Sequence, residues 1–395
     1  MDWKTAWSYL PVNHNTCIGT VENITQRSVF KNNLSGTKVK IKFSNLFSKD
    51  ALVIDHVTIG TKDLENNNDI KKMQAVTYQG KETIRIESGE EFYSDEIDYA
   101  LSNGEDIVVS IYIKERTEIC SVCSTWEARS WYTQYGLAGN FVAEQEFTET
   151  DAYEVFPVLK YDINRANHIF GITEIKVYTE QEVKTVALFG DSITHMSYYS
   201  DALIEKLYDS YPGKITVVNR GLGGNRLLRD YSRIEEIPSG GTIFGEAGVE
   251  RFYHDIYSSD QPDHIIVLIG INDLTHPYAL KHLDEAITID EYQEGIIKLI
   301  DIAHEKGSKI LLGTLTPFIF GAEEWYTPVE TLRQLVNQWI RSQKYSDGIV
   351  DFDLATRQSK TPERMLEDCH LGDGLHPNSE GGRKMAEAID VDWLI

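Results

Sequence analysis

The second half of the chain contains five short, almost wholly apolar runs separated by longer segments. The five runs are VKTVALFG, KITVVNRG, HIIVLIG, KILLGTL and GIVDFD. Such runs are typical of parallel strands that are buried on both faces of a sheet. The longer segments with a helical spacing of apolar residues are YSDALIEKLYDSY, IDEYQEGIIKLIDIAHEKG, PVETLRQLVNQWIRSQ and SEGGRKMAEAID. The alternation predicts an α/β domain over residues 181–395, with a doubly wound five-stranded parallel sheet and a site at the carboxyl ends of its strands.

The first half of the chain, residues 1–180, has a period of two instead. Apolar and polar residues alternate in KVKIKFSN, LVIDHVTIG, ETIRIESG, DIVVSIYIK and ITEIKVYT, and Asn, Asp, Gly and Ser are frequent between these segments. This is the pattern of short antiparallel strands joined by turns. Because no long helical pattern interrupts it, we expect an all-β, jelly-roll-like sandwich domain before the α/β domain.

The chain is strongly acidic, with a formal charge of −24 from 62 acidic and 38 basic residues. A surface of this sign repels nucleic acid and anionic membranes, so we expect neither as a partner. The opening MDWKTAWSYLPVNHN has no basic region followed by an apolar run, and no stretch approaches the roughly 18 apolar residues of a membrane span. We therefore expect a cytoplasmic protein without a signal peptide.

The four cysteines are Cys17, Cys120, Cys123 and Cys369. Only Cys120 and Cys123 form a CxxC, no second pair stands at zinc-finger spacing, and no βαβ pattern surrounds the pair. We expect reduced, structurally incidental thiols. Neither a metal nor a cofactor is expected.

Ser192 closes the tripeptide Gly190-Asp191-Ser192, which follows the apolar run VALF directly. It is therefore expected where a strand turns toward a helix, with its hydroxyl at the sheet edge and its backbone N–H facing a reacting carbonyl. On the tripeptide alone, a serine that caps a helix is the stronger interpretation. The sequence blocks described next favour a nucleophilic role for Ser192 instead.

Two further blocks supply hydrogen-bond donors. NRGLGGN follows the second apolar run and GIND follows the third, and in this topology both ends flank the end of the first strand. The N–H of Gly224, the side-chain amide of Asn272 and the N–H of Ser192 together make three donors for the oxyanion of a tetrahedral intermediate. Taken one at a time, Gly224 is interpreted as a glycine in a turn and Asn272 as an amide that caps a loop. Gly223 is an alternative to Gly224 as the backbone donor.

Asp373 and His376 stand three residues apart in DGLH, before the last expected helix. The carboxylate can bond one ring nitrogen of the histidine while the other nitrogen faces Ser192, which completes a nucleophile, a base and a group that orients the base. A surface loop or half of a metal site is the alternative. Asp191 and His195 are candidates for lining the substrate pocket, although a helix-surface position is favoured for His195.

These blocks resemble the four blocks of the SGNH (GDSL) hydrolases. The matching segments are GDSIT at 190–194, GLGGN at 221–225, GIND at 270–273 and DGLHP at 373–377, with TLTPF at 314–318 and VDFD at 350–353 in support. The resemblance implies that Ser192 is the nucleophile, that Asp373 and His376 complete the triad, and that Gly224 and Asn272 are oxyanion donors. The first half resembles, less specifically, the β-sandwich that precedes the hydrolase domain in bacterial two-domain esterases of this family.

The resemblance implies hydrolysis of short-chain esters, with O-acetyl groups on small molecules or oligosaccharides as the expected substrates. Aromatic residues in the first half, Trp126, Trp131, Tyr132 and Tyr135, are candidate platforms for sugar rings, and a packed aromatic patch at the domain interface is the alternative. Lipase, thioesterase, aryl esterase and transacylase activities are rival functions. A carbohydrate-binding protein with an inactive second domain is a rival of another class. The sequence leaves the oligomeric state open.

Overall fold

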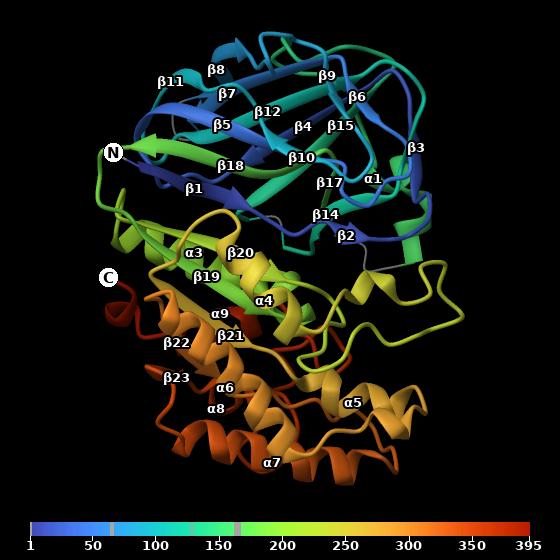
Figure 1. Ribbon diagram of the computed structural model, residues 1–395, viewed down its shortest axis with the longest axis vertical. Helices are drawn as coiled ribbons and strands as arrows, with labels where there is room; N and C mark the ends of the chain where they lie inside the picture. The colour runs from blue at the N-terminus through green and yellow to red at the C-terminus, as the bar shows by residue number, and fades with distance from the viewer. Residues whose placement is uncertain (1, 64–66, 128, 162–166) are drawn as a thin grey trace. The chain divides into compact units, whose positions relative to one another are not determined.

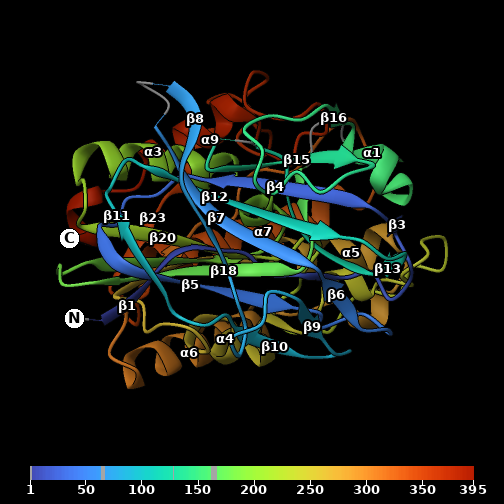
Figure 2. The ribbon, with the colours of Figure 1, turned by 90° about the horizontal axis from the view of Figure 1, so that it is seen from above.

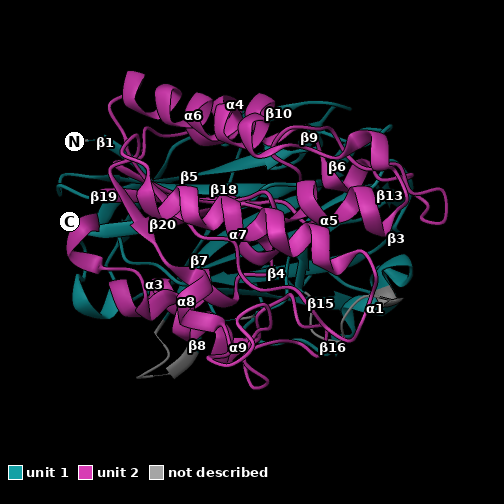
Figure 3. Cartoon of the chain, turned by 90° about the horizontal axis from the view of Figure 1, so that it is seen from below, with its two compact units in different colours: residues 1–183, 208–216 teal, residues 184–207, 217–395 magenta. Residues whose placement is uncertain are grey.

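The structure, a computed structural model, describes residues 2–63, 67–127, 129–161 and 167–395. The chain divides into two compact units, which Figure 3 draws in different colours. The first unit comprises residues 1–183 and 208–216, and the second comprises residues 184–207 and 217–395.

The first unit contains two large antiparallel sheets (Figures 1 and 2). One sheet has the strands β1 (Asp2–Ser8), β18 (Ile172–Thr179), β5 (Gly36–Ser44), β10 (Glu91–Tyr93) and β11 (Ile97–Leu101). The other has the strands β16 (Glu149–Thr150), β15 (Trp131–Leu137), β4 (Ile24–Phe30), β12 (Asp106–Ile113), β7 (His56–Asp63) and β8 (Asn67–Ala75). The remaining elements are β2 (Val12–Asn13), β3 (Gly19–Val21), β6 (Leu52–Ile54), β9 (Ile84–Ile86), β13 (Thr117–Ile119), β14 (Ser121–Thr125), β17 (Asn167–Ile169), α1 (Ala152–Val155) and a 3-10 turn over Pro157–Tyr161.

The two sheets share one apolar core, as expected for a β-sandwich. Val39, Ile41 and Phe43 of β5 are buried in that core, whereas the lysines between them are not. Alternate residues of β12 enter the same core. The predicted sandwich is confirmed, and its alternating strands lie where the period of two placed them.

Strand β4 was not predicted because its residues do not alternate between apolar and polar. All of ITQRSVF is buried, including Arg27. The guanidinium of Arg27 donates to the hydroxyl of Ser110 at 2.8 Å and to the carbonyl of Phe141 at 2.8 Å. A charged residue with such partners can be buried inside a sheet, so its polarity hides the strand from a pattern of hydrophobicity.

The second unit contains the parallel sheet β20-β19-β21-β22-β23. Its strands are β19 (Lys184–Gly190), β20 (Ile215–Gly221, which begins in the segment assigned to the first unit), β21 (His264–Leu268), β22 (Lys309–Gly313) and β23 (Gly348–Val350). This confirms the predicted doubly wound five-stranded fold. The first strand in sequence lies inside the sheet, so the chain leaves it in both directions, and the carboxyl ends of β19, β20 and β21 are neighbours.

Helices cover both faces of this sheet, with α4 and α6 on one face and α3, α8 and α9 on the other (Figure 3). The helices are α2 (Ser192–His195), α3 (Tyr198–Ser210), α4 (Gly248–Tyr257), α5 (Ile271–Ala279), α6 (Ile289–Glu305), α7 (Tyr326–Ser342), α8 (Phe352–Thr356) and α9 (Ser379–Glu387), with 3-10 turns at Thr242–Phe244, Leu283–Glu285 and Val391–Leu394. The segment VDFD, expected to be a strand, leaves the sheet after Val350 because Asp351 caps α8. None of the helices in the described ranges is both long and apolar enough to cross a membrane.

Candidate active site

Ser192 is the first residue of helix α2, directly after strand β19. The cap of that helix is Asp191, whose carboxylate accepts the N–H of Ile193 at 3.0 Å. Gly190 is required by close packing, since a Cβ there would lie 2.3 Å from the hydroxyl of Thr194. Asp191 therefore takes the capping role that the tripeptide alone suggested for Ser192, and the serine hydroxyl is left for other contacts.

The hydroxyl of Ser192 is hydrogen bonded to a histidine that is itself held by a carboxylate. The distance from Oγ of Ser192 to Nε2 of His376 is 2.9 Å, and Nδ1 of His376 lies 2.6 Å from Oδ2 of Asp373. With Nδ1–H donated to the carboxylate, Nε2 is left to accept the serine proton. The structure thus brings together the three residues that the sequence proposes as nucleophile, base and orienting group.

The loop 370–376 that carries Asp373 and His376 is folded by its own side chains. Oδ1 of Asp373 accepts the N–H groups of Leu375 and His376, both at 3.0 Å, while Oδ2 takes the histidine ring. Nδ1 of His370 accepts the N–H groups of the two glycines of the loop, at 2.9 and 3.2 Å. Those glycines, Gly372 and Gly374, have φ values of +102° and +75°, which other residues rarely adopt.

Asp373 is ionised over the whole range in which an esterase works. Burial raises the pKa of its carboxyl, but the hydrogen bond and charge of His376 outweigh burial, and the pKa falls to about 2. A carboxylate that stays charged can stabilise the imidazolium that forms when His376 takes up a proton.

The N–H of Gly224, the proposed oxyanion donor, has no hydrogen-bond partner among the described residues, whereas the N–H of Gly223 donates to Nδ1 of His195 at 3.0 Å. Gly224 has a φ of +70°. Asn272 lies in the first turn of α5, and its side-chain amide donates to the carbonyl of Asn225 at 3.0 Å. That bond uses one of two amide hydrogens and leaves the other for a ligand. The contacts favour Gly224 over Gly223 as the donor.

Two residues that the sequence analysis did not assign hold this region together. Arg251 of α4 donates to the carbonyl of Gly190 at 2.8 Å and to Oδ1 of Asn225 at 2.8 Å, so one buried guanidinium joins the end of β19 to the turn after Gly224. Asp273 accepts the N–H groups of Leu227 and Leu228 at 2.6 and 2.9 Å. Arg251 lies in no recognisable motif, whereas Asp273 lies in the GIND block and could have been predicted from it.

The ring of Phe244 packs against Gly224. A Cβ on Gly224 would lie 2.1 Å from Cδ1 of Phe244, so the ring occupies the space that any side chain there would need. The carbonyl of Phe244 accepts the side-chain amide of Asn225 at 2.7 Å, which fixes the aromatic residue beside the proposed oxyanion donors.

The structure places several predicted substrate-binding residues away from the surface. Asp191 is 1% exposed, and it caps α2. His195 is 4% exposed and accepts from Gly223, so the expected helix-surface position is wrong. Trp131 is 1% exposed in the core of the first unit, where it contacts Trp7 and Tyr9. A sugar platform at Trp131 is therefore wrong, because the inward face of β15 carries it.

The other aromatic candidates divide between buried and half-buried positions. Tyr135 is buried and donates to the carbonyl of His168 at 2.6 Å. Trp126 and Tyr132 are half-buried. Trp131 and Tyr135 are therefore packed side chains in the core of the first unit rather than sugar platforms.

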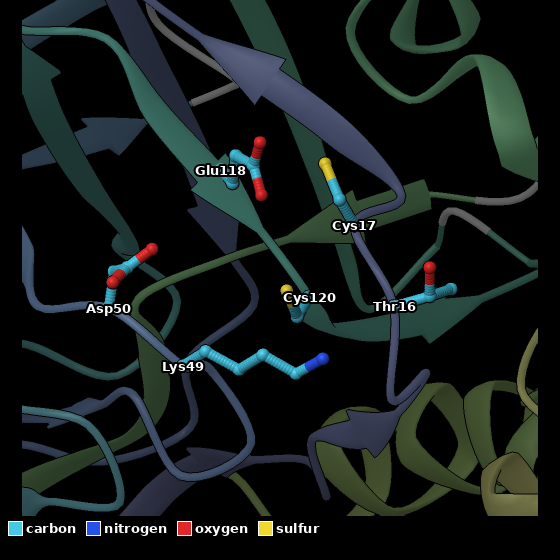
Figure 4. A pocket seen from close by; sticks show the side chains of 6 residues that line it. All are labelled: Thr16, Cys17, Lys49, Asp50, Glu118 and Cys120. Atoms are coloured by element: carbon cyan, nitrogen blue, oxygen red, sulfur yellow. The ribbon is translucent and has the colours of Figure 1, made fainter.

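A pocket of about 270 Å³ in the first unit contains two of the cysteines (Figure 4). Its lining residues are Thr16, Cys17, Lys49, Asp50, Glu118 and Cys120. Cys120 thus shares a pocket with Cys17, while its CxxC partner Cys123 packs in the core. Each of the four cysteines is a thiol rather than half of a disulfide. Burial, followed by the charge of Cys17, raises the pKa of Cys120. Within the described residues, no group of three or more His, Cys, Asp or Glu side chains is arranged to hold a metal ion.

Comparison with known families agrees with the geometry of the second unit. Residues 188–384 match the model of the GDSL-like lipase/acylhydrolase family. The second unit is a domain of this family. The predicted resemblance is confirmed, and the protein is a carboxylic ester hydrolase.

Solved structures and curated proteins add little to this. A catalytic mutant of the acetylxylan esterase Axe2 from Geobacillus stearothermophilus is 22% identical, over 53% of this chain and 94% of that one, with a TM-score of 0.40. LAE5, an α/β hydrolase enzyme from the metagenome of Lake Arreo in Spain, is 18% identical over 53% and 94%, with a TM-score of 0.40. The acetyl xylan esterase AlAXEase is 19% identical over 52% and 96%, with a TM-score of 0.38. None of the curated proteins matches the esterase in sequence.

Proposed function

We propose that the esterase hydrolyses short-chain acyl esters, chiefly acetyl esters of saccharides, through an acyl-Ser192 intermediate. The observation that carries the proposal is the bonded series from Oγ of Ser192 to His376 at 2.9 Å and on to Asp373 at 2.6 Å. A serine hydroxyl is a poor nucleophile by itself, and a neutral imidazole held in the right tautomer removes its proton as it attacks.

The reaction would follow two stages. In the first, Oγ of Ser192 attacks the ester carbonyl while Nε2 of His376 takes the serine proton, and the resulting imidazolium then protonates the leaving alkoxide. In the second, His376 takes a proton from water, the hydroxide attacks the acyl-serine, and the proton returns to Oγ of Ser192 as the acid leaves.

The oxyanion of each tetrahedral intermediate would accept from Ser192 N–H, Gly224 N–H and the second amide hydrogen of Asn272. These donors are already oriented by their neighbours, so the protein need not reorganise as charge develops. The side-chain amide of Asn272 donates a hydrogen bond to the carbonyl of Asn225 at 3.0 Å. Oδ1 of Asn225 in turn accepts a hydrogen bond from Arg251 at 2.8 Å.

Two features support a short acyl group and a bulky, polar alcohol. Phe244 fills the space beside Gly224, which leaves little room for a long chain on the oxyanion side. By contrast, the side chains of Asp373 and His376 are 46% and 21% exposed, so the side from which the leaving alcohol is protonated is open to water. That openness favours hydrolysis over transfer to another alcohol and suits a hydrated substrate better than a lipid.

Kinetics of two variants test the mechanism. Ser192→Ala is expected to abolish hydrolysis of p-nitrophenyl acetate and labelling by a fluorophosphonate. Asn272→Ala is expected to lower kcat by about 10²–10³ with little change in KM, as loss of an oxyanion donor does. Circular dichroism of both variants checks that they fold. A Ser192→Ala protein as active as the parent would contradict the scheme.

The same assays separate the rival functions. Falling kcat/KM from p-nitrophenyl acetate to the octanoate supports a short acyl group, and a preference for octanoate would show a lipase-like enzyme instead. A protein that binds acetylated oligosaccharides but does not label at Ser192 would be a binding protein. Capture of the acetyl group by added sugar faster than by water would identify a transacylase.

A further inference from the structure

Phe320 is an exposed aromatic ring beside the loop that carries His376. It follows strand β22 in the chain and is 50% exposed, although its neighbour Phe318 is 5% exposed. Its Cβ lies 2.7 Å from the position that a Cβ on Gly374 would take, and its ring centroid is 5.7 Å from that of His370. The ring therefore packs on the loop 370–376 and still presents half of its surface to solvent.

The backbone around Phe320 is fixed on both sides. Its carbonyl accepts the hydroxyl of Tyr326 at 2.8 Å, and the next carbonyl, of Gly321, accepts the guanidinium of Arg364 at 2.7 Å. A single exposed apolar residue is ordinary on a protein surface. A ring that is held by its backbone against the loop that carries the proposed base is different, because a ligand can contact it without first ordering its segment.

The chemistry of ester cleavage indicates which part of the substrate lies near this ring. If the proposed function is correct, as this inference requires, Nε2 of His376 protonates the leaving oxygen, so the alcohol must lie on the histidine side of Ser192. The acyl oxygen lies instead toward Gly224 and Asn272. Phe320, which packs on the histidine loop, is on the side of the leaving alcohol.

The surroundings of Phe320 favour an uncharged alcohol with hydroxyl groups. Nδ1 of His370 accepts two backbone N–H groups, so in the neutral ring the proton is on Nε2, which can donate to a hydroxyl. Glu323 and Glu324 are exposed on the segment that carries Phe320, and their negative charges disfavour a leaving group that bears phosphates.

We propose that Phe320, with His370 beside it, forms a subsite for the sugar ring of the leaving alcohol. One face of a pyranose carries C–H groups and can lie on the apolar aromatic ring, while an oxygen of the sugar, either a hydroxyl or the ring oxygen, accepts from Nε2 of His370. The subsite makes the enzyme selective for acetylated sugars over acyclic acetates that have the same acyl group.

The test compares two acetyl esters of polyols, glucose pentaacetate and triacetin, of which only the first has a ring. Phe320→Ala is expected to raise KM for glucose pentaacetate about tenfold, the size of a lost aromatic contact, with kcat within about twofold. Both constants for triacetin are expected to stay unchanged, and Phe320→Trp should retain the low KM for the sugar ester. Tyr345→Ala, which removes an aromatic side chain that is 56% exposed elsewhere, is the control and should alter neither substrate.

Three results would overturn the subsite. Equal loss of kcat on both esters in Phe320→Ala would mean that the ring only supports the histidine loop. Faster hydrolysis of longer acyl chains by the same variant would place the ring on the acyl side. An unchanged KM for the sugar ester would show that the ring does not bind the sugar. Failure of the proposed function is distinguishable, because the parent enzyme would then neither label at Ser192 with a fluorophosphonate nor cleave triacetin.

Discussion

The oxyanion side of the site and its histidine side differ in how they are held. Ser192, Gly224 and Asn272 follow three different strands, and Ser192 and Asn272 are 8% and 5% exposed. Asp373 and His376 instead share the single loop 370–376, where the carboxylate side chain of Asp373 is 46% exposed. The first side is joined by buried long-range bonds, whereas the second is folded by bonds within the loop.

This difference has consequences for how each side responds to change. On the oxyanion side, Arg251 binds residues that are far apart in sequence, so one substitution can shift the donors relative to the nucleophile. On the histidine side, His370 and Asp373 hold the turns of the loop through bonds within the loop. A substitution there should therefore lower the rate less, and a replacement side chain with an acceptor atom in the same place should restore the rate.

Among the substitutions that test this difference between the two sides, Arg251→Lys is expected to have the largest effect. Lysine keeps the charge beside Asp255 but loses the planar set of donors that reaches Gly190 and Asn225 together. A displacement of the donors by about 1 Å costs about 10²-fold in rate, so kcat on p-nitrophenyl acetate should fall by that factor with KM nearly unchanged.

Arg333→Lys is the matched control for this prediction. Arg333 is also fully buried and binds Asp353 and the carbonyl of Leu315, but it makes no bond to Gly190 or Asn225. Both variants should lower the thermal midpoint, while only Arg251→Lys should lower kcat at a temperature where both are folded. Equal losses of kcat would show that Arg251 acts only through stability.

A smaller effect is expected from His370→Ala. Loss of Nδ1 leaves the N–H groups of Gly372 and Gly374 without their acceptor, and the loop then holds His376 less precisely. We expect kcat to fall about tenfold, less than for a donor side chain that contacts the oxyanion. His370→Asn should recover most of the rate, because its Oδ1 can accept the same two N–H groups. An asparagine variant as slow as the alanine variant would contradict this role of His370.

The residues of the site that could be predicted from the sequence are those whose role depends on a local motif. Ser192, Asp373 and His376 follow strands or turns with recognisable blocks, and the structure places them in one hydrogen-bonded series. Arg251 was not predictable in this way, since its partner Asn225 is 26 positions earlier and no periodic pattern connects them. Long-range polar contacts are a property of the packed fold rather than of any segment.

The same reasoning explains what could be predicted of the fold. Near-continuous apolar runs identified all strands of the second unit, because both faces of a parallel sheet are buried. Alternation identified β5 and β12, but it did not say which face of β15 points inward, so the sequence left Trp131 open between a sugar platform and a packed position. Helix α4 was not predicted, and the burial of its polar residues Arg251 and Asp255 could not be read from the sequence.

The smallest effect concerns the one acid on the oxyanion side that lies directly before the nucleophile. Burial raises the pKa of Asp191 to about 7, and its Oδ2 has no hydrogen-bond partner among the described residues. The folded pKa exceeds the unfolded value of about 4, so folding takes up a proton at Asp191 between about pH 4 and pH 7. The protonated carboxyl therefore contributes its full stability below about pH 4. That stability is lost as the pH rises to about 7. Asp191→Asn keeps an oxygen that can accept from Ile193 and removes the titration. Its thermal midpoint should therefore fall less than that of the parent between about pH 5 and pH 8. Parallel midpoint curves for the two proteins over this range would show that Asp191 has an ordinary pKa.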